Sequence, residues 1–290
     1  SGDFDFSRNS AATRVNAQGL VENVQILSSN LVQNGDFSEE GVQEVSNGSF
    51  TNGSTDWILG SGWSIGEDKA VADGTTNNAI SQTTISSVVG KSYKIDFTID
   101  DYVTGNIRIY FGGVFTPFVN VNGVYSFYIT ATAVDALATS ASGLFNGSIT
   151  NISVKEVGQN WDLTGTWSIE NQKATTNGDG TTQYLGQLLN VVIGKSYKIT
   201  YNILENTLSN NRLLMSGTSS FISTQLPSNI GENSIILEAT GVASSGYSIR
   251  FANSATNNSG VLSITNISVI EITDDTNLPR INYEGFSYQD

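Results

Sequence analysis

Two pairs of neighbouring carboxylates are the residues of this chain that come closest to a catalytic group. Asp100-Asp101 and Asp274-Asp275 each place two acids side by side. Hydrolysis of a glycosidic bond needs two carboxylates roughly 5–10 Å apart across a cleft. Neighbouring side chains of a strand point to opposite faces of the sheet, so neither pair is suited to that chemistry. We therefore interpret both pairs as solvated turn carboxylates and predict no catalytic residue.

The composition excludes most other chemistry. The 290 residues include no His and no Cys. This excludes Ser-His-Asp and Cys-His nucleophiles, zinc sites built from His or Cys, disulfides, and haem or iron–sulfur ligation. Only oxygen donors are left for a metal ion, which favours Ca²⁺ or Mg²⁺.

The charge and hydropathy patterns exclude two classes of partner. Lys+Arg total 13 and Asp+Glu total 27, so the formal net charge is −14. An acidic chain repels phosphate backbones and anionic membrane surfaces, so we expect no nucleic-acid partner. No apolar run approaches the roughly 18 residues of a membrane helix, so we expect no membrane insertion.

An internal repeat determines the predicted organisation of the chain. Trp57 and Trp63 recur as Trp161 and Trp167, each 104 residues later, and the run Gly90-Lys91-Ser92-Tyr93 recurs at the same spacing. A period near a hundred residues corresponds to a whole domain. We predict one module over residues 45–157, a second over residues 158–273, and a linker over residues 32–44.

The apolar pattern within each module is that of β-strands. Tyr93, Ile95, Phe97 and Ile99 alternate with polar residues, and the segment 197–203 does the same. Turn signals such as Asp73-Gly74 follow about every ten residues, and no segment has a helical stripe longer than two turns. Short strands at this spacing predict an all-β fold, with two tandem antiparallel β-sandwich or jelly-roll modules inserted in a small discontinuous flanking unit.

The framework residues of the modules resemble those of a known family. The runs Asn47-Gly48-Ser49-Phe50 and Gly62-Trp63-Ser64-Ile65, with the closing strand 149–156, resemble carbohydrate-binding modules of the galactose-binding-like jelly-roll group. The second module lacks the Asn-Gly-x-Phe opening and keeps only Gln159-Asn160-Trp161. The resemblance implies a fold, and it implies a structural Ca²⁺ site near the first and last strands. Four acids would supply oxygen donors there: Asp36, Glu39, Asp56 and Glu156. No cofactor is required.

Aromatic residues are the candidate sugar contacts, because flat aromatic faces pair with pyranose rings. The four Trp residues stand at equal positions in both repeats beside framework Gly and Ile, which indicates core packing rather than ligand binding. Aromatic residues that differ between the repeats are better candidates. They are Tyr102, Tyr110, Phe115, Phe118 and Tyr128 in the first module, and Tyr184, Phe221 and Tyr247 in the second.

The flanking segments resemble a second group of proteins. The run Phe6–Glu22, which contains Ala12-Thr13-Arg14-Val15-Asn16, and the run Pro279–Tyr283 resemble a segment of bacteriophage virion proteins, particularly tail and head fibres. The two runs are often nearly contiguous there, which implies that residues 1–31 and 274–290 form one discontinuous mounting unit.

This resemblance also implies partners. Arg8, Arg14 and Arg280 would make charge-assisted contacts to carboxylates of a neighbouring subunit or domain, with an intrachain salt bridge or plain solvation as the alternative. Phage fibres are commonly homotrimers, so the resemblance implies self-association as a trimer.

These observations predict a non-enzymatic virion protein in an extracellular setting. It would be a fibre or fibre-attachment component whose modules contact host-surface polysaccharide or other virion proteins. Two alternatives stay open at this point. One is a secreted bacterial adhesin or polysaccharide-binding module pair. The other is a capsule depolymerase component, because carboxylates alone suffice for that hydrolysis.

Overall fold

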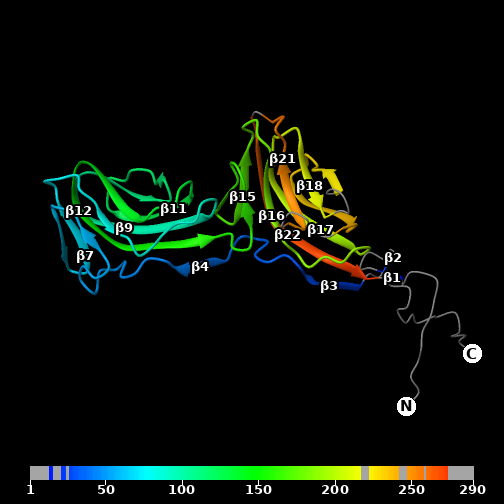
Figure 1. Cartoon of the computed structure of the whole chain (residues 1–290), viewed down its shortest axis with the longest axis horizontal. Helices are drawn as coiled ribbons and strands as arrows, with labels where there is room; N and C mark the ends of the chain where they lie inside the picture. The colour runs from blue at the N-terminus through cyan, green and yellow to red at the C-terminus, as the bar shows by residue number, and fades with distance from the viewer. Residues whose placement is uncertain are drawn as a thin grey trace, which may run out of the picture.

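All elements in the described part of the chain are β-strands, as the sequence predicts. The computed structural model describes residues 13–15, 21–23, 26–216, 222–241, 247–257 and 259–273. These residues contain no helix, and therefore no helix that could span a membrane. Figure 1 shows two bodies, module one with its long strands lying across the view and module two standing beside it. The prediction of an all-β fold with two antiparallel β-sandwich modules is confirmed.

Module one is organised around two long paired strands, β9 (Ser92–Phe111) and β12 (Leu137–Val157). The first half of β9 pairs with β11 (Gly123–Thr130), and its second half pairs with β10 (Val114–Phe115). Positive φ angles at Asp101 and Gly105 lie between the two halves of β9, so each half belongs to a different layer of the sandwich. The other strands are β4 (Glu40–Gln43), β5 (Ile58–Leu59), β6 (Trp63–Gly66), β7 (Lys69–Asp73) and β8 (Ile80–Gln82).

Module two has the same two layers as separate sheets. One sheet has the order β14-β15-β22-β17-β20, and the other has the order β13-β16-β21-β18-β19. The first contains β14 (Ser168–Glu170), β15 (Lys173–Asn177), β17 (Ser196–Asn206), β20 (Gly231–Glu238) and β22 (Val261–Thr273). The second contains β13 (Asp162–Leu163), β16 (Gln183–Gln187), β18 (Asn211–Met215), β19 (Ile222–Gln225) and β21 (Ile249–Asn253).

Module two begins before module one in the sequence, which corrects the predicted boundaries. Strand β3 (Ile26–Asn30) pairs with β22, and Val32 and Phe37 are buried in the core of module two. The Trp161 indole Nε1 donates to the Asn34 carbonyl at 3.0 Å, as Trp57 Nε1 donates to the Asn47 carbonyl at 3.0 Å in module one. Residues 32–44 are therefore not a linker. The opening that module two was expected to lack is Asn34-Gly35-Asp36-Phe37.

Module one is thus inserted in a loop of module two. In module one, the tilted rings of Phe50 and Trp57 pack together across a short loop, and in module two the equivalent pair is Phe37 and Trp161. The whole of module one lies between Phe37 and Trp161. Strand β4 pairs with the end of β12, so module one starts and finishes at the same place. A surface loop accepts an inserted domain whose ends are close together.

The described part of the flanks is a hairpin in which β1 (Thr13–Val15) pairs with β2 (Val21–Asn23). Arg14 lies in β1, and only its backbone is described. Arg8, Arg280 and the whole segment 274–290 lie outside the described residues. The mounting unit and its arginine contacts therefore stay predictions, although residues 26–31 of the predicted range belong to module two.

Candidate functional site

The outer face of one sheet carries the predicted aromatic residues of module one. Along β9 the side chains of Ile107, Ile109 and Phe111 are buried, and alternation places Arg108 and Tyr110 on the opposite face. Phe115 in β10 is the cross-strand partner of Tyr110. Ordinary strand geometry therefore brings the Arg and the aromatic side chains together on the surface.

These side chains form a cluster around a guanidinium group. The Arg108 Cζ lies 3.7 Å from the ring centroid of Phe115 and 4.1 Å from that of Phe118. The two rings remain 45% and 43% exposed, respectively. The Tyr110 ring lies 4.7 Å from Phe115 between centroids. We call Arg108, Tyr110, Phe115 and Phe118 the Arg108 cluster.

Hydrogen bonds orient the polar atoms of the Arg108 cluster. Arg108 Nε donates to Ser140 Oγ at 3.4 Å, from the neighbouring strand β12. The Tyr110 hydroxyl donates to Asp135 Oδ2 at 2.7 Å, and this bond raises the pKa of Tyr110 above its ordinary value. Within the described residues no carboxylate forms an ion pair with Arg108. A positive charge framed by exposed rings is therefore available to an anionic group.

Module two carries a comparable cluster on the same layer. The Arg250 Cζ lies 4.8 Å from the Tyr184 centroid and 4.8 Å from the Tyr247 centroid, and the two rings are 5.9 Å apart. The Tyr247 ring covers Gly186, where an added Cβ would come within 2.7 Å of a ring atom. Burial raises the pKa of Tyr247. We call Arg250, Tyr184 and Tyr247 the Arg250 cluster.

The two clusters use different strands of the same scaffold. In module two the residue equivalent to Arg108 is Arg212 of β18, 104 residues later, and it donates to Ser223 Oγ at 3.1 Å. The arginine that contacts rings there is Arg250 of the adjacent strand β21, which pairs with Leu214 of β18. The framework is repeated, but the surface residues on it are arranged differently.

The structure gathers most of the predicted aromatic contacts and separates the others. Tyr110, Phe115 and Phe118 share one cluster, and Tyr184 and Tyr247 share the other. Tyr102 packs against Phe145 with 6.5 Å between centroids and donates to the Gly105 carbonyl at 3.2 Å, away from both clusters. Tyr128 packs against the core of module two, and Phe221 lies outside the described residues.

Sequence reasoning missed the two arginines at the cluster centres. The signal was present in the alternation, because Arg108 interrupts Ile107-Ile109-Phe111 and Arg250 lies between Ile249 and Phe251. A charged residue between buried neighbours in a strand must lie on the outer face.

The four Trp side chains are buried in the two cores, which confirms their predicted structural role. In module one the Trp63 indole Nε1 donates to the Asn78 carbonyl at 2.8 Å. The equivalent Trp167 Nε1 is buried with no hydrogen-bond partner among the described residues.

The acidic residues expected at a Ca²⁺ site are not gathered into one. The Asp36 carboxylate accepts hydrogen bonds from the Ser38 backbone and hydroxyl, and Glu156 pairs with Lys91 at 3.4 Å. Glu39 and Asp56 are exposed. No group of three or more acidic side chains in the described ranges is arranged to hold a metal ion. The structure therefore does not support Ca²⁺ ligation by this set.

The pair Asp100-Asp101 has a structural partner. Lys69 Nζ lies 3.4 Å from Asp100 and 3.1 Å from Asp101. Hydrogen bonds from Ser148 and Lys69 lower the pKa of Asp101. Asp101 is thus held as a carboxylate beside a lysine, and Asp274-Asp275 lies outside the described residues.

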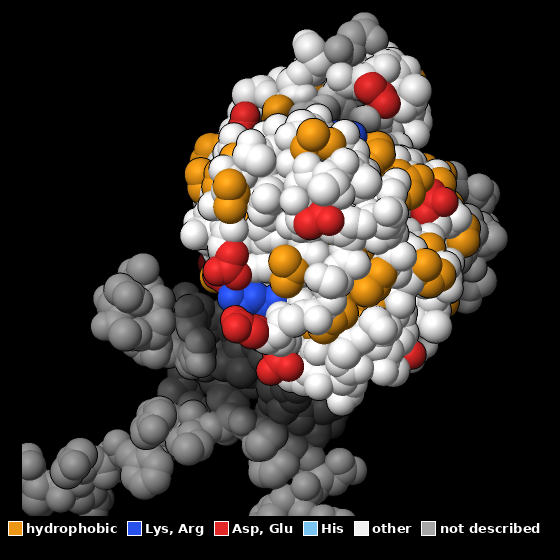
Figure 2. Space-filling model, turned by 90° about the vertical axis from the view of Figure 1, so that its left-hand side faces the viewer, with side chains coloured by type: hydrophobic (Ala, Val, Ile, Leu, Met, Phe, Trp, Pro, Cys, Tyr) orange, Lys and Arg blue, Asp and Glu red, His pale blue; other side chains and the backbone are white. Residues whose placement is uncertain are grey.

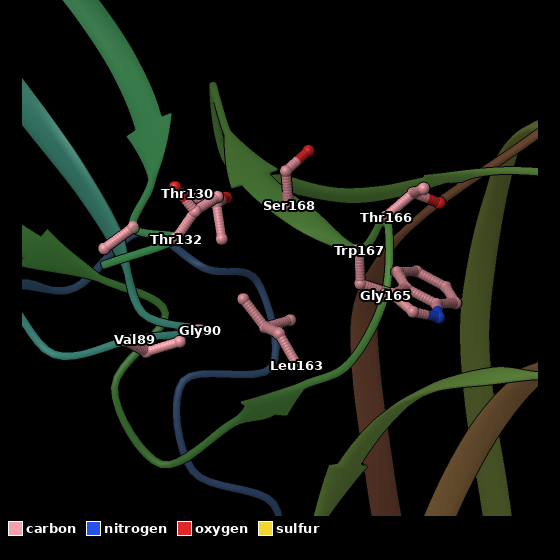
Figure 3. Close-up of a pocket in the computed structure, with 10 residues that line it drawn as sticks. Val89, Gly90, Thr130, Thr132, Leu163, Gly165, Thr166, Trp167 and Ser168 are labelled. Carbon is pink, nitrogen blue, oxygen red and sulfur yellow. The ribbon is translucent and has the colours of Figure 1, made fainter. Parts of the chain in front are cut away.

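A cleft of about 450 Å³ separates the two modules. Figure 3 shows Leu163 between the Val89-Gly90 turn of module one and Trp167 of module two, with Thr130 and Thr132 above it. The Trp167 indole points away from the cleft (Figure 3). No charged residue lines this space, and Thr130 is already bonded to Ser92 at 2.9 Å. The cleft therefore has no charged group with which to bind or react with a ligand.

Charge is spread over the end of module one that lies farthest from module two. Figure 2 shows that backbone and side chains that are neither charged nor hydrophobic cover most of this end, and that hydrophobic side chains form small groups among them. A Lys or Arg group at the lower left lies between acidic side chains. This view gives no sign of a concentrated charged site.

Comparisons with known proteins leave the family open. No family model and no curated protein matches the sequence. One similar solved structure is the N-terminal CBM22-1-CBM22-2 tandem domain of Paenibacillus barcinonensis Xyn10C. It is 12% identical, with 81% of this chain and 98% of that chain covered, and the TM-score is 0.29.

Two further solved structures are also distant. Allantoicase is 10% identical, with 80% of this chain and 89% of that chain covered, at a TM-score of 0.26. A chain of the Sulfolobus turreted icosahedral virus is 14% identical, with 68% of this chain and 60% of that chain covered, at a TM-score of 0.19. At these values none of the three carries an inference about ligand or activity.

Proposed function

We propose that this chain is a non-enzymatic virion protein of a phage, a fibre or fibre-attachment component whose modules contact glycans of the host surface. The observation that carries the glycan contact is the Arg108 cluster, in which two half-exposed rings frame a guanidinium group. The resemblance of the flanks to phage fibre proteins supports the virion setting, the extracellular location and the homotrimer. Contacts with other virion proteins would be made through the flanks.

The Arg108 cluster suits an acidic glycan. Exposed aromatic faces contact the apolar faces of sugar rings. The guanidinium group donates bidentate hydrogen bonds to a carboxylate, sulfate or phosphate substituent, and Arg108 has no carboxylate partner in the described part of the chain. Packing between two rings holds this group in place before a ligand arrives, which lowers the entropic cost of binding.

The state of the carboxylates favours binding over hydrolysis. Asp100 and Asp101 share the Lys69 ammonium group, so neither is placed as an acid and nucleophile pair across a cleft. A capsule depolymerase would release reducing ends from host capsule. We expect no such release by the full chain, and a rise in reducing sugar would overturn the non-enzymatic assignment.

Binding is tested by titrating the full chain with an acidic bacterial polysaccharide and with a neutral one. We expect the Arg108→Gln variant to lose at least tenfold in affinity for the acidic polysaccharide. The matched control is Arg212→Gln, which removes the equivalent arginine of module two, where it donates to Ser223 instead of contacting rings. Equal losses in both variants, or equal affinity of the wild-type chain for neutral and acidic polysaccharide, would contradict the proposed site.

The virion setting is tested separately from binding. Mass spectrometry of purified phage particles should detect this chain, and sedimentation should give a mass near three times 30.9 kDa. Detection only in the secreted fraction of bacteria that release no particles would favour the adhesin alternative.

A further inference from the structure

One face of module one holds the two modules together. The Ile169 backbone N–H of module two donates to Ser92 Oγ at 3.2 Å, and both groups are buried. Lys91 Nζ reaches the Trp161 carbonyl at 3.5 Å, and Tyr128 of β11 packs against the core of module two. We call this surface, formed by residues 87–92 and the end of β11, the joined face.

Module two repeats the joined face at its opposite end. Gly90 N–H donates to the Ala131 carbonyl at 2.8 Å, and Gly194 N–H donates to the Ala239 carbonyl at 2.7 Å. The Tyr93 hydroxyl accepts from Val88 N–H at 2.9 Å, and the Tyr197 hydroxyl accepts from Val192 N–H at 2.7 Å. We call the surface formed by residues 191–196 and the end of β20 the open face.

An ion pair on each face extends this match to the last strand of each module. Lys91 lies 3.4 Å from Glu156 on the joined face, and Lys195 lies 3.6 Å from Glu271 on the open face. The two faces therefore share a backbone arrangement and an ion pair, while their edge strands carry different side chains, with Ile236 in place of Tyr128 and Glu238 in place of Thr130.

The open face is apolar where the joined face is covered. Ile236 pairs with Lys198 as Tyr128 pairs with Lys94, so Ile236 occupies the place of the residue that packs on the neighbouring module. Ile236 is 52% exposed, whereas Tyr128 is partly buried against module two. Val192 and Ile193 beside it are each 54% exposed, close to the 55% and 56% of their equivalents Val88 and Val89. Ser92 is fully buried on the joined face, but Ser196 is partly exposed on the open face. A group of apolar side chains left open in this way indicates a contact surface.

The path of the chain indicates which segment can cover the open face. At the joined face Glu40 pairs with Val157, and the chain passes from there directly into module two. At the open face Ile26 pairs with Thr273, so the segments 1–25 and 274–290 both begin there. Figure 1 shows β3 and β22 reaching the same end of module two, on the side away from module one.

We infer that the open face docks against the part of this chain formed by residues 1–25 and 274–290. Module two is then held on the flanks by the same face, and in the same way, as module one is held on module two. This inference concerns the assembly of the chain and does not depend on glycan binding.

The absence of Cys makes a direct test simple, because each variant carries a single reactive thiol. The probe is Ile236→Cys in the full chain, labelled with a maleimide. The control is Val124→Cys on the equivalent edge strand of module one, where the native side chain is 81% exposed. The reference for both is the chain shortened to residues 26–273. It keeps every residue of the two buried cores and should therefore fold on its own.

We expect Ile236→Cys to be labelled at least tenfold more slowly in the full chain than in the shortened chain, at every protein concentration. Val124→Cys should be labelled equally fast in both. Equal rates for Ile236→Cys in the two chains would overturn the inference. Protection that appears only as protein concentration rises would also overturn it, since a second copy would then cover the face. Thermal unfolding of each variant verifies that the thiol reports on a folded chain.

Discussion

The two modules share a scaffold but differ in what they expose and in how their chain is arranged. Both bury an equivalent Phe–Trp pair, with centroids 5.1 Å apart in module one and 5.5 Å apart in module two. Module one is one continuous segment, whereas module two is completed by residues that precede module one. The ring-contacting arginine lies on β9 in one and on β21 in the other. The core thus specifies the fold, while the outer strand positions are free to differ.

The largest effect is expected from Phe37→Ala, which tests the split architecture of module two. Phe37 would be a linker residue if module two began at residue 158, and its loss would then change stability by less than about 0.5 kcal/mol. As a buried core residue in contact with Trp161, its loss should cost about 3–5 kcal/mol. Denaturant unfolding measures the difference. The matched variant Ser38→Ala, at an exposed neighbour, should stay near wild type.

The sequence was sufficient for the class of fold but not for the course of the chain. Alternation in segments such as 93–99 predicts strands because it depends only on local periodicity. The opening Asn34-Gly35-Asp36-Phe37 precedes its repeat at Asn47 by 13 residues, whereas every other repeat is separated by about a hundred. A search for one spacing therefore assigns both openings to the same module. Which opening joins which core is decided by pairing of β3 with β22, a contact between residues distant in sequence.

The candidate sites could be predicted only in part, because contacts between residues distant in sequence decide which aromatic residues come together. Aromatic residues that differ between the repeats include Tyr110 and Tyr184, which do lie in the clusters. The same criterion also selected Tyr128, which packs against the core of module two where the modules meet. Sequence differences between the repeats select residues outside the shared framework, but they do not distinguish a ligand contact from a contact with the core or between modules. That distinction depends on which face meets the other module.

A second stability test compares two glycines with left-handed backbones. Gly158 joins the modules at φ +73°, and an added Cβ would lie 2.1 Å from Ile169 Cδ1. Gly53 has φ +62° and has no atom within 4 Å of an added Cβ. Gly53→Ala should cost about 1 kcal/mol for backbone strain alone. Gly158→Ala should cost about 2–3 kcal/mol, because Ile169 must also move. Thermal unfolding of both variants ranks them, and equal costs would show that the junction is loosely packed.

A smaller effect is expected on the affinity for an acidic polysaccharide when one ring is removed from the cluster of either module. Phe118→Ala removes an exposed ring beside Arg108, and Tyr184→Ala removes a ring beside Arg250. If each module contacts glycan, each variant should weaken binding of an acidic polysaccharide by roughly threefold to tenfold, or about 0.7–1.4 kcal/mol. Isothermal titration of the full chain measures both. A loss in only one variant would assign glycan contact to that module alone.

The smallest effect concerns an ion-pair network that, in the part of the chain the structure describes, only module one contains. Glu40 accepts hydrogen bonds from Lys94 at 2.7 Å and from Lys155 at 2.9 Å, and these bonds lower its pKa below the ordinary value of 4.5. The equivalent Lys198 of module two has no ion pair among the described residues. Because the folded pKa of Glu40 lies below the unfolded one, its stabilisation is complete above pH 4.5 and is lost as pH falls through the folded value. Glu40→Gln should therefore lower the free energy of unfolding at pH 7 by less than about 1 kcal/mol, as is usual for partly exposed ion pairs.

Lowering the pH is the control for the Glu40 network, because protonation removes the charge of the Glu40 side chain. In urea unfolding, the difference between wild type and Glu40→Gln should shrink towards zero as pH falls from 5 to 2, since the wild-type side chain is then protonated and uncharged. Lys198→Gln in module two should show no such pH dependence, because no carboxylate in the described residues pairs with Lys198. A difference at Glu40 that persists unchanged at pH 2 would mean that packing of its side chain, rather than its charge, stabilises the strand pair β4 and β12.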